Sequence, residues 1–338
     1  MTNPIRTFIA VLALFLTPFQ GPAQVAQDLT LKVSDDTGRV LVGAQATITF
    51  VDIASRENPH EGPTNEQGEF RASTSMSIAT FLQASMPGHY PALVRSSNYY
   101  DMPIGEATVP VVLPRVLQPT ALHALRVSLN LPVQDEWLGY DLQVADFVAP
   151  HGKGKIADIR FKLRNEFMGY LAEGPKLESA RELSRVSAQR GGRTFTEEDF
   201  KRSAGKWRGA LEVSFPGEKE GVITEAERYW FYGQLRLPHL APEEGYAPDL
   251  RYDAKTYEPR PEPKRVGYFL RTRVQLDADG DIVSANYAKI YDDIRFDARG
   301  SVSFWYYFNP TPNERNLEFD PARNLFPPSM NGANVANP

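Results

Sequence analysis

The sequence predicts a mainly β protein, built from two antiparallel β-rich domains with one short helical insertion. Three observations carry this prediction. Apolar residues alternate with polar ones over short runs, which is the period of a half-buried strand. Glycine, proline, asparagine and aspartate separate these runs at short intervals, as they do between strands. Only one region, near residue 180, repeats its apolar residues at helical spacing.

The first such runs lie at residues 29–33 and 44–50, where every second residue is apolar. Turn sequences follow them, ending in Gly38 and Gly68. Glycine adopts the positive φ that tight hairpin turns need without steric cost. Residues 27–117 are therefore expected to form a small β-sandwich, in which Pro110 favours an edge position for the last strand.

Three segments of this sandwich carry a family resemblance: residues 38–46, 64–70 and 87–90. They resemble the carboxypeptidase regulatory-like domain, a transthyretin-like, immunoglobulin-like β-sandwich often grouped with carbohydrate-binding-like folds and common in secreted bacterial proteins. The resemblance implies a non-catalytic binding or spacer role and transfers no catalytic residue. Residues 148–158 and 313–326 resemble segments of uncharacterised secreted bacterial proteins that carry the same domain, which implies a shared two-part architecture.

The N-terminus is typical of an export signal. Arg6 precedes an apolar run at residues 8–16, Pro18 breaks that run, and small residues then allow cleavage after Ala23 or Ala26. The run is too short to span a bilayer, which takes about 20 residues. A retained N-terminal anchor is the alternative. We expect residues 1–26 to be a signal peptide and the mature protein to be periplasmic or extracellular.

After a proline-punctuated crossover, the second domain is expected over residues 118–328. Alternating runs predict strands, and Asp277 to Gly280 predicts a hairpin turn between two of them. Thr196, followed by three acidic residues, is suited to cap a helix. The expected parts of this region are strands at 211–215, 266–276, 282–290 and 301–308, a helical insertion at about 176–206, a proline-rich loop at about 238–264, and a flexible tail at 329–338.

Composition excludes several functional classes. The chain has no cysteine, so it has no disulfide framework, thiolate metal site or catalytic thiol. A net charge of −5, with no clustered basic face, argues against a nucleic-acid partner. No segment after the signal is apolar enough to cross a membrane. No cofactor-binding motif is present, so we expect no cofactor.

Aromatic residues crowd two strands and supply the candidate ligand-binding residues. Residues 229–232 and 305–308 are entirely aromatic. Strand alternation places two rings on each face, and one face could offer a flat platform for sugar rings. The alternative is that both faces are buried. The sequence nominates four rings: Trp230, Tyr232, Trp305 and Tyr307.

A glycine-rich loop supplies the second candidate group: Asp146, His151, Lys153 and Asp158. Functionally, its histidine and carboxylates could perform acid–base chemistry, which would make the protein a hydrolase. Structurally, the loop is a solvated turn, and no second histidine lies at a metal-ligand spacing. The alternate carboxylates of Asp277 to Asp281 lack the later glutamate of a calcium loop. We therefore expect neither a catalytic nor a metal site.

Together these features predict a secreted, non-catalytic protein that binds carbohydrate or another envelope polymer. An envelope scaffold that contacts protein partners is the main alternative, and an uncharacterised hydrolase is the other.

Overall fold

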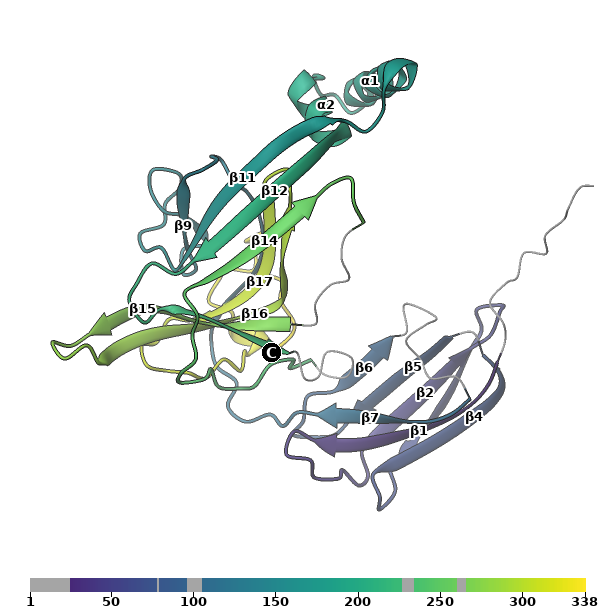
Figure 1. Ribbon diagram of the computed structural model, residues 1–338. Helices are drawn as coiled ribbons and strands as arrows, with labels where there is room; N and C mark the ends of the chain where they lie inside the picture. The colour runs from purple at the N-terminus through teal and green to yellow at the C-terminus, as the bar shows by residue number, and fades with distance from the viewer. Residues whose placement is uncertain (1–24, 78, 96–104, 227–233, 260–265) are drawn as a thin grey trace, which may run out of the picture. The chain divides into compact units, whose positions relative to one another are not determined.

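The computed structural model describes residues 25–77, 79–95, 105–226, 234–259 and 266–338, which are mainly β (Figure 1). The expected signal peptide, apart from its last two residues, lies outside these ranges. The chain divides into two compact units. The first comprises residues up to 34, 40–84 and 94–111, and the second comprises 35–39, 85–93 and 112–338. The predicted mainly β fold class is confirmed.

Seven strands form two sheets of a β-sandwich, in the orders β4-β1-β7 and β3-β2-β5-β6. Their bounds are β1 (Val25–Asp35), β2 (Gln45–Val51), β3 (Glu57–Pro63), β4 (Glu69–Ser77), β5 (Ala79–Ser85), β6 (Ala92–Arg95) and β7 (Gly105–Leu113). The alternating residues expected in the core, such as Leu29 and Ile48, are fully buried.

Local chemistry fixes the turns and edges of this sandwich. Gly38 and Gly68 both have positive φ, as predicted. A side chain at Gly68 would also lie within 2.7 Å of the Val33 carbonyl oxygen, so only glycine fits there. Pro110 lies in β7, which is an edge strand, where the missing N–H breaks no ladder bond between central strands.

Ten strands form two five-stranded sheets in the second unit, in the orders β10-β9-β11-β12-β14 and β13-β15-β16-β17-β8. Their bounds are β8 (His123–Asn130), β9 (Trp137–Asp141), β10 (Asp146–Phe147), β11 (Ile159–Tyr170), β12 (Gly205–Ser214), β13 (Gly221–Ala226), β14 (Asp249–Lys255), β15 (Val266–Leu276), β16 (Ile282–Asp297) and β17 (Ser301–Asn309). A short 3-10 helix, Pro321–Arg323, follows.

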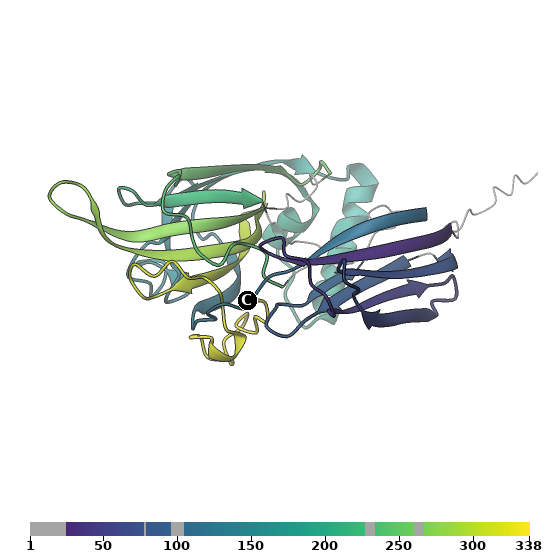
Figure 2. The same ribbon diagram turned by 90° about the horizontal axis from the view of Figure 1, so that it is seen from below.

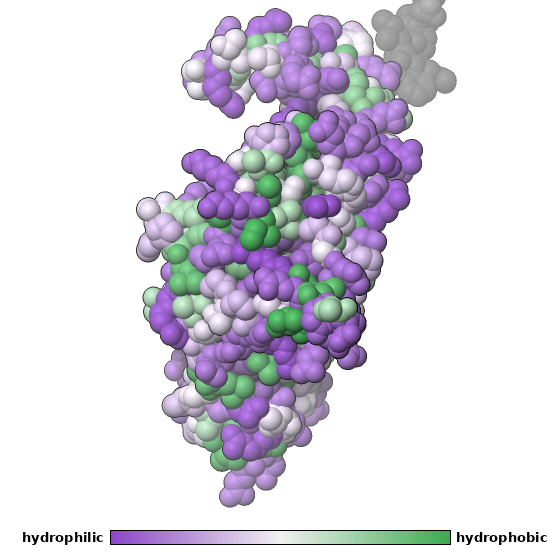
Figure 3. All heavy atoms as spheres, turned by 90° about the vertical axis from the view of Figure 1, so that its left-hand side faces the viewer, coloured by the Kyte–Doolittle hydropathy of each residue, from purple (hydrophilic) through white to green (hydrophobic). Residues whose placement is uncertain are grey.

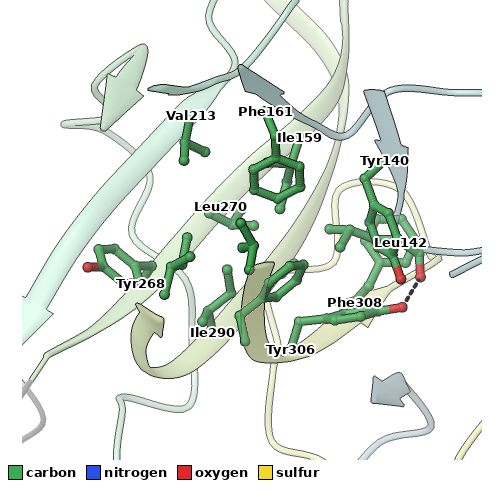
Figure 4. Packing of buried hydrophobic residues seen from close by; sticks show 14 of the residues in the cluster. Tyr140, Leu142, Ile159, Phe161, Val213, Tyr268, Leu270, Ile290, Tyr306 and Phe308 are labelled. Atoms are coloured by element: carbon green, nitrogen blue, oxygen red, sulfur yellow. Dashed lines mark hydrogen bonds between the residues drawn. The ribbon is translucent and has the colours of Figure 1, made fainter. Parts of the chain in front are cut away.

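The two sheets of the second unit bury one hydrophobic core between them (Figure 4). Phe161 and Val213 enter it from one sheet, and Ile290 and Tyr306 enter it from the other. The Tyr306 hydroxyl donates to the Leu142 carbonyl oxygen at 2.8 Å, so this buried polar group is satisfied.

The opposite face of the β13-β15-β16-β17-β8 sheet is also covered. Loop residues from three later segments, including Leu237, Leu317 and Val335, pack on it. Lys289 is fully buried on this face, and its Nζ lies 2.8 Å from the Tyr291 hydroxyl oxygen. Burial holds the pKa of Lys289 well below its ordinary value. Strand β17 therefore has a buried layer on each side.

The helical insertion comprises α1 (Gly174–Arg190) and α2 (Glu197–Ala204). The Thr196 hydroxyl accepts the Asp199 N–H at 3.0 Å, which is the predicted cap. No residue of α1 is buried. This agrees with its thin apolar stripe and charged remaining surface.

One segment differs from expectation. Strand β14 lies inside residues 238–264, which were expected to be a loop throughout. Leu250 and Tyr252 alternate with polar residues and pack against the core, which explains the strand. The predicted hairpin between β15 and β16 is present and extends beyond the sheet (Figure 2). At its tip, the Asp277 carboxylate accepts the Asp279 and Asp281 N–H groups, so these backbone donors are paired within the turn.

Candidate functional site

Trp305 and Tyr307 lie on β17 and face the loop-covered side of their sheet. Trp305 is 6% exposed and Tyr307 is 0% exposed. The Tyr307 hydroxyl donates to the Asn337 carbonyl oxygen at 3.0 Å. The Arg126 guanidinium covers the Trp305 ring, with Cζ 4.2 Å from the ring centroid. Neither ring presents an open stacking surface. Trp230 and Tyr232 lie outside the described residues.

Asp158 belongs to a buried ion-pair network that ties the glycine-rich loop to β15. Arg273 donates to both Asp158 carboxylate oxygens at 2.8 Å and to Asp141 at 2.9 Å. Asp141 also accepts four backbone N–H groups, those of residues 143, 144, 155 and 156. Burial alone would raise the pKa of Asp141, but these donors and Arg273 hold it below its ordinary value. We therefore interpret the network as structural, since it holds the glycine-rich loop against β15.

The rest of the loop is held by its backbone. Asp146 accepts the N–H groups of Phe147 at 2.8 Å and Lys153 at 2.9 Å. A side chain at Gly152 would come within 2.3 Å of the Phe147 carbonyl oxygen, so the glycine permits a close approach of two backbones. The side chains of His151 and Lys153 are exposed. The side chains of the four residues that the sequence nominated in this loop therefore do not come together in one site.

His123 lies beside this network and is expected to make stability pH-dependent. Its ring packs 4.7 Å from the Phe326 ring, and burial, together with the nearby Arg273, lowers the pKa of His123 from 6.5 to about 4. The unfolded chain therefore binds more protons below pH 6.5, and the free energy of unfolding falls as pH drops from 6.5 towards 4. After allowing for partial exposure, the loss is on the order of 1–2 kcal/mol.

Urea unfolding of the wild type and His123→Phe at several pH values measures this effect. The variant keeps a ring against Phe326, so its free energy of unfolding should fall less steeply between pH 6.5 and 4. Parallel curves for the two proteins would contradict the assignment.

A β-bulge opens a pocket in the same sheet as Trp305. Tyr291 pairs with Trp305 and Arg295 pairs with Ser303, so three residues of β16 oppose one residue of β17. Asp292, inside the bulge, has a φ of 60°. Bulges are over-represented next to functional sites because they redirect side chains. The resulting bulge pocket has a volume of about 240 Å³ and is lined by Arg126, Val127, Tyr291, Asp292, Asp293, Arg295, Ser303, Phe304 and Trp305.

Basic groups and an unsatisfied donor border the bulge pocket. The buried Trp305 indole Nε1–H has no hydrogen-bond acceptor within the described ranges. Among the residues that the structure describes, the Arg126 and Arg295 guanidiniums form no ion pair, and both side chains are exposed. An unsatisfied buried donor costs about 1–3 kcal/mol, so Trp305 is a position where an acceptor would be favourable.

The carboxylates of the pocket are fixed in place. Asp292 accepts from Arg236 at 2.9 Å. Asp293 Oδ1 accepts from the Tyr252 hydroxyl at 3.1 Å and from the Tyr268 hydroxyl. Burial and the Asp293 carboxylate raise the pKa of Tyr268 above its ordinary value, so its phenol remains a donor. The second Asp293 oxygen has no hydrogen bond in the described part of the chain.

A second depression, of about 200 Å³, lies on the outer face of the other sheet. It is lined by Arg164, Asn165, Glu166, Arg208, Gly209, Ala210, Arg251 and Asp253, with no aromatic ring. Arg164 and Arg251 already pair with carboxylates. Trp137, on β9 of the same sheet, is 43% exposed. The depression also holds one buried polar atom without a hydrogen-bond partner among the described residues, Asn165 Oδ1. It differs from the bulge pocket in having no aromatic ring.

Within the described ranges, no group of three histidine, aspartate or glutamate side chains could hold a metal ion. No helix among those residues is long and apolar enough to span a membrane. The face shown in Figure 3 carries hydrophobic residues in small separate groups among hydrophilic ones.

Sequence reasoning nominated Trp305 but missed Arg126, Asp293 and Arg295. No local motif marks them, because the pocket depends on a bulge and on pairing between strands distant in sequence. The doublet Asp292-Asp293, inside an otherwise apolar strand, is the one signal that could have indicated an irregularity there.

No protein-family profile and no curated protein matches the chain. Among solved structures, it is similar to 3-chlorocatechol 1,2-dioxygenase from Rhodococcus opacus, with 11% identity and a TM-score of 0.24. That match covers 29% of this chain and 62% of the dioxygenase chain, which is less than two thirds of its length.

Two other matches cover more of the chain but have lower TM-scores. The chain is similar to a DUF3823 family protein from Parabacteroides merdae (6% identity, 84% of this chain, 96% of that chain, TM-score 0.21). It is also similar to a candidate carbohydrate-binding protein from Bacteroides uniformis (10% identity, 85% of this chain, 98% of that chain, TM-score 0.19). Similarities of this strength support no functional argument.

Proposed function

We propose that this protein is an exported, non-catalytic binding protein that holds a saccharide unit of an envelope polymer in the bulge pocket. The observation that carries the proposal is the buried indole N–H of Trp305, a lining residue of the bulge pocket, which has no acceptor among the described residues. The export signal expected at residues 1–26 supports the envelope context.

The pocket chemistry favours a polyhydroxylated ligand. Arg126, Arg295 and the Trp305 N–H can donate, and the Ser303 hydroxyl can donate or accept. Vicinal sugar hydroxyls supply donors and acceptors in the same small volume. A pocket of about 240 Å³ is below the roughly 300–1,000 Å³ of drug-sized ligand sites, which fits one sugar residue of a chain.

The role of Trp305 therefore differs from that of a flat platform. Its ring stacks against the Arg126 guanidinium, and its N–H has no acceptor among the described residues. Stacking of this kind reduces the mobility of the long arginine side chain, and a preorganised side chain loses less entropy on binding.

A non-catalytic role suits the pocket because its described lining contains no histidine or lysine. Its two carboxylates are engaged, Asp292 by an arginine and Asp293 by two phenols.

Binding assays of the purified protein against soluble and insoluble polysaccharides test this proposal. We expect binding to at least one polysaccharide, with a loss of tenfold or more in Arg126→Ala. Trp305→Phe should also weaken binding, because phenylalanine preserves an aromatic ring but removes the N–H.

Arg208→Ala is the matched control, since Arg208 is an exposed arginine of the second depression. It should bind like the wild type. Absence of binding across the panel would contradict the proposal, as would a loss in Arg208→Ala with retention in Arg126→Ala. Circular dichroism should show that each variant is folded.

A further inference from the structure

We infer that the saccharide held in the bulge pocket carries a carboxylate, as a uronic acid residue does, and that Arg126 and Arg295 bind this group. The inference rests on the proposed function and specifies its ligand class. It follows from strand register, from the local charge and from guanidinium geometry.

Strand register places both arginines on the same face of the sheet. Arg126 on β8 is opposite Trp305, and Arg295 on β16 is opposite Ser303. Ser303 and Trp305 are two residues apart on β17, so they share a face, and their partners share it with them.

A short side chain leaves room between the two guanidiniums. Strands β8 and β16 flank β17, and neighbouring strands are about 4.8 Å apart, so their axes are separated by roughly 10 Å. Ser303 lies between them, and its partner on β8, Ser128, is equally small. Arg295 is therefore level with the two serines, and Arg126 lies two residues away along β8, beside Trp305.

The lining of the pocket carries two arginines, Arg126 and Arg295, and two aspartates, Asp292 and Asp293. Both aspartates already accept hydrogen bonds from the protein: Asp292 accepts from Arg236, and Asp293 accepts from two phenols. Among the described residues, the two lining arginines have no carboxylate partner, so an anionic group of the ligand could pair with them.

Guanidinium geometry favours a planar carboxylate. Arginine donates through a rigid fork that matches the two oxygens of a carboxylate, and such charge-assisted pairs are roughly twice as strong as neutral hydrogen bonds. Arg126 is already oriented by its stacking on Trp305. The remaining hydroxyls of the sugar would then lie near Ser303.

Calorimetric titration with oligogalacturonate and with its carboxyl-reduced, neutral counterpart tests the inference. We expect the wild type to bind the acidic oligomer at least tenfold more tightly than the neutral one. Arg295→Gln should reduce this preference to threefold or less while affecting neutral binding little, because glutamine retains a donor but no charge. Arg208→Gln, in the second depression, should retain the full preference.

The outcomes separate the two proposals. Equal affinity for the two oligomers would overturn the carboxylate assignment and leave saccharide binding intact. A preference that survives in an Arg126→Gln/Arg295→Gln double variant would overturn the arginine assignment. Binding of neither oligomer, in a protein that also binds no other polysaccharide, would overturn both the inference and the proposed function.

Discussion

Replacing Arg273 with leucine is expected to lower the free energy of unfolding by about 3–5 kcal/mol at neutral pH, as breaking one side of a buried ion pair does. Asp158 is 0% exposed and Asp141 is 2% exposed, so the variant would leave two buried carboxylates without their cation. The loss of Arg273 also removes its contact with the Phe308 ring, whose centroid lies 4.8 Å from Cζ.

The effect should depend on pH in a defined direction. Arg273 helps to hold the pKa of Asp141 below its ordinary value, so without it Asp141 takes up a proton more easily and part of the destabilisation disappears in acid. Urea unfolding at pH 7 and pH 4 should show a smaller difference from the wild type at the lower pH. Arg164→Leu, which removes an exposed pair with Asp135, is the control and should change stability by less than about 1 kcal/mol. An equally small change in Arg273→Leu would show that the network is not structural.

Asp293→Ala is expected to reduce stability by about 2–3 kcal/mol and to abolish saccharide binding. The change removes the acceptor of two phenol hydroxyls, and hydrogen bonds to charged groups contribute about 1.5–3 kcal/mol each. Tyr252 and Tyr268 can still bond to each other at 2.9 Å, which limits the loss. The bulge would also lose the contact that orients it against β15 and β14.

Asp292→Asn tests whether any substitution in the bulge lowers stability and binding, or only one that removes the phenol contacts of Asp293. Asn tolerates positive φ, and the partly exposed pair with Arg236 should contribute about 1 kcal/mol or less. Thermal unfolding and polysaccharide binding should therefore change little in this variant. If both variants lose the same stability, the phenol contacts are not what fixes the bulge.

Much of the fold could be predicted from sequence because period-two alternation reports burial directly. It located the strands around Leu29, Ile48 and Leu211, and turn glycines such as Gly68 located the hairpins. The helix at Thr196 followed from capping chemistry. Strand β14 was missed because the prolines that flank it and the charged residues within it outweighed a short alternation at Leu250 and Tyr252.

The candidate site could be predicted only in part, for a physical reason. Alternation shows that Trp305 and Tyr307 share a face, but burial of that face depends on loops contributed by residues near 237, 317 and 335. No local pattern reports what covers a sheet. The pocket likewise depends on a bulge at Asp292 and on the pairing of Arg126 with Trp305, which lie far apart in the chain.

The measurement that most directly tests saccharide binding in the bulge pocket is the indole spectrum of the protein labelled with ¹⁵N-tryptophan. The chain has four tryptophans, and Trp305→Phe identifies the Trp305 signal by its disappearance. On addition of the polysaccharide fragment that binds most tightly, the Trp305 indole proton should move downfield and exchange more slowly, because it gains an acceptor. An unchanged Trp305 signal with a shifted Trp137 signal would contradict the assignment and place the ligand on the other sheet.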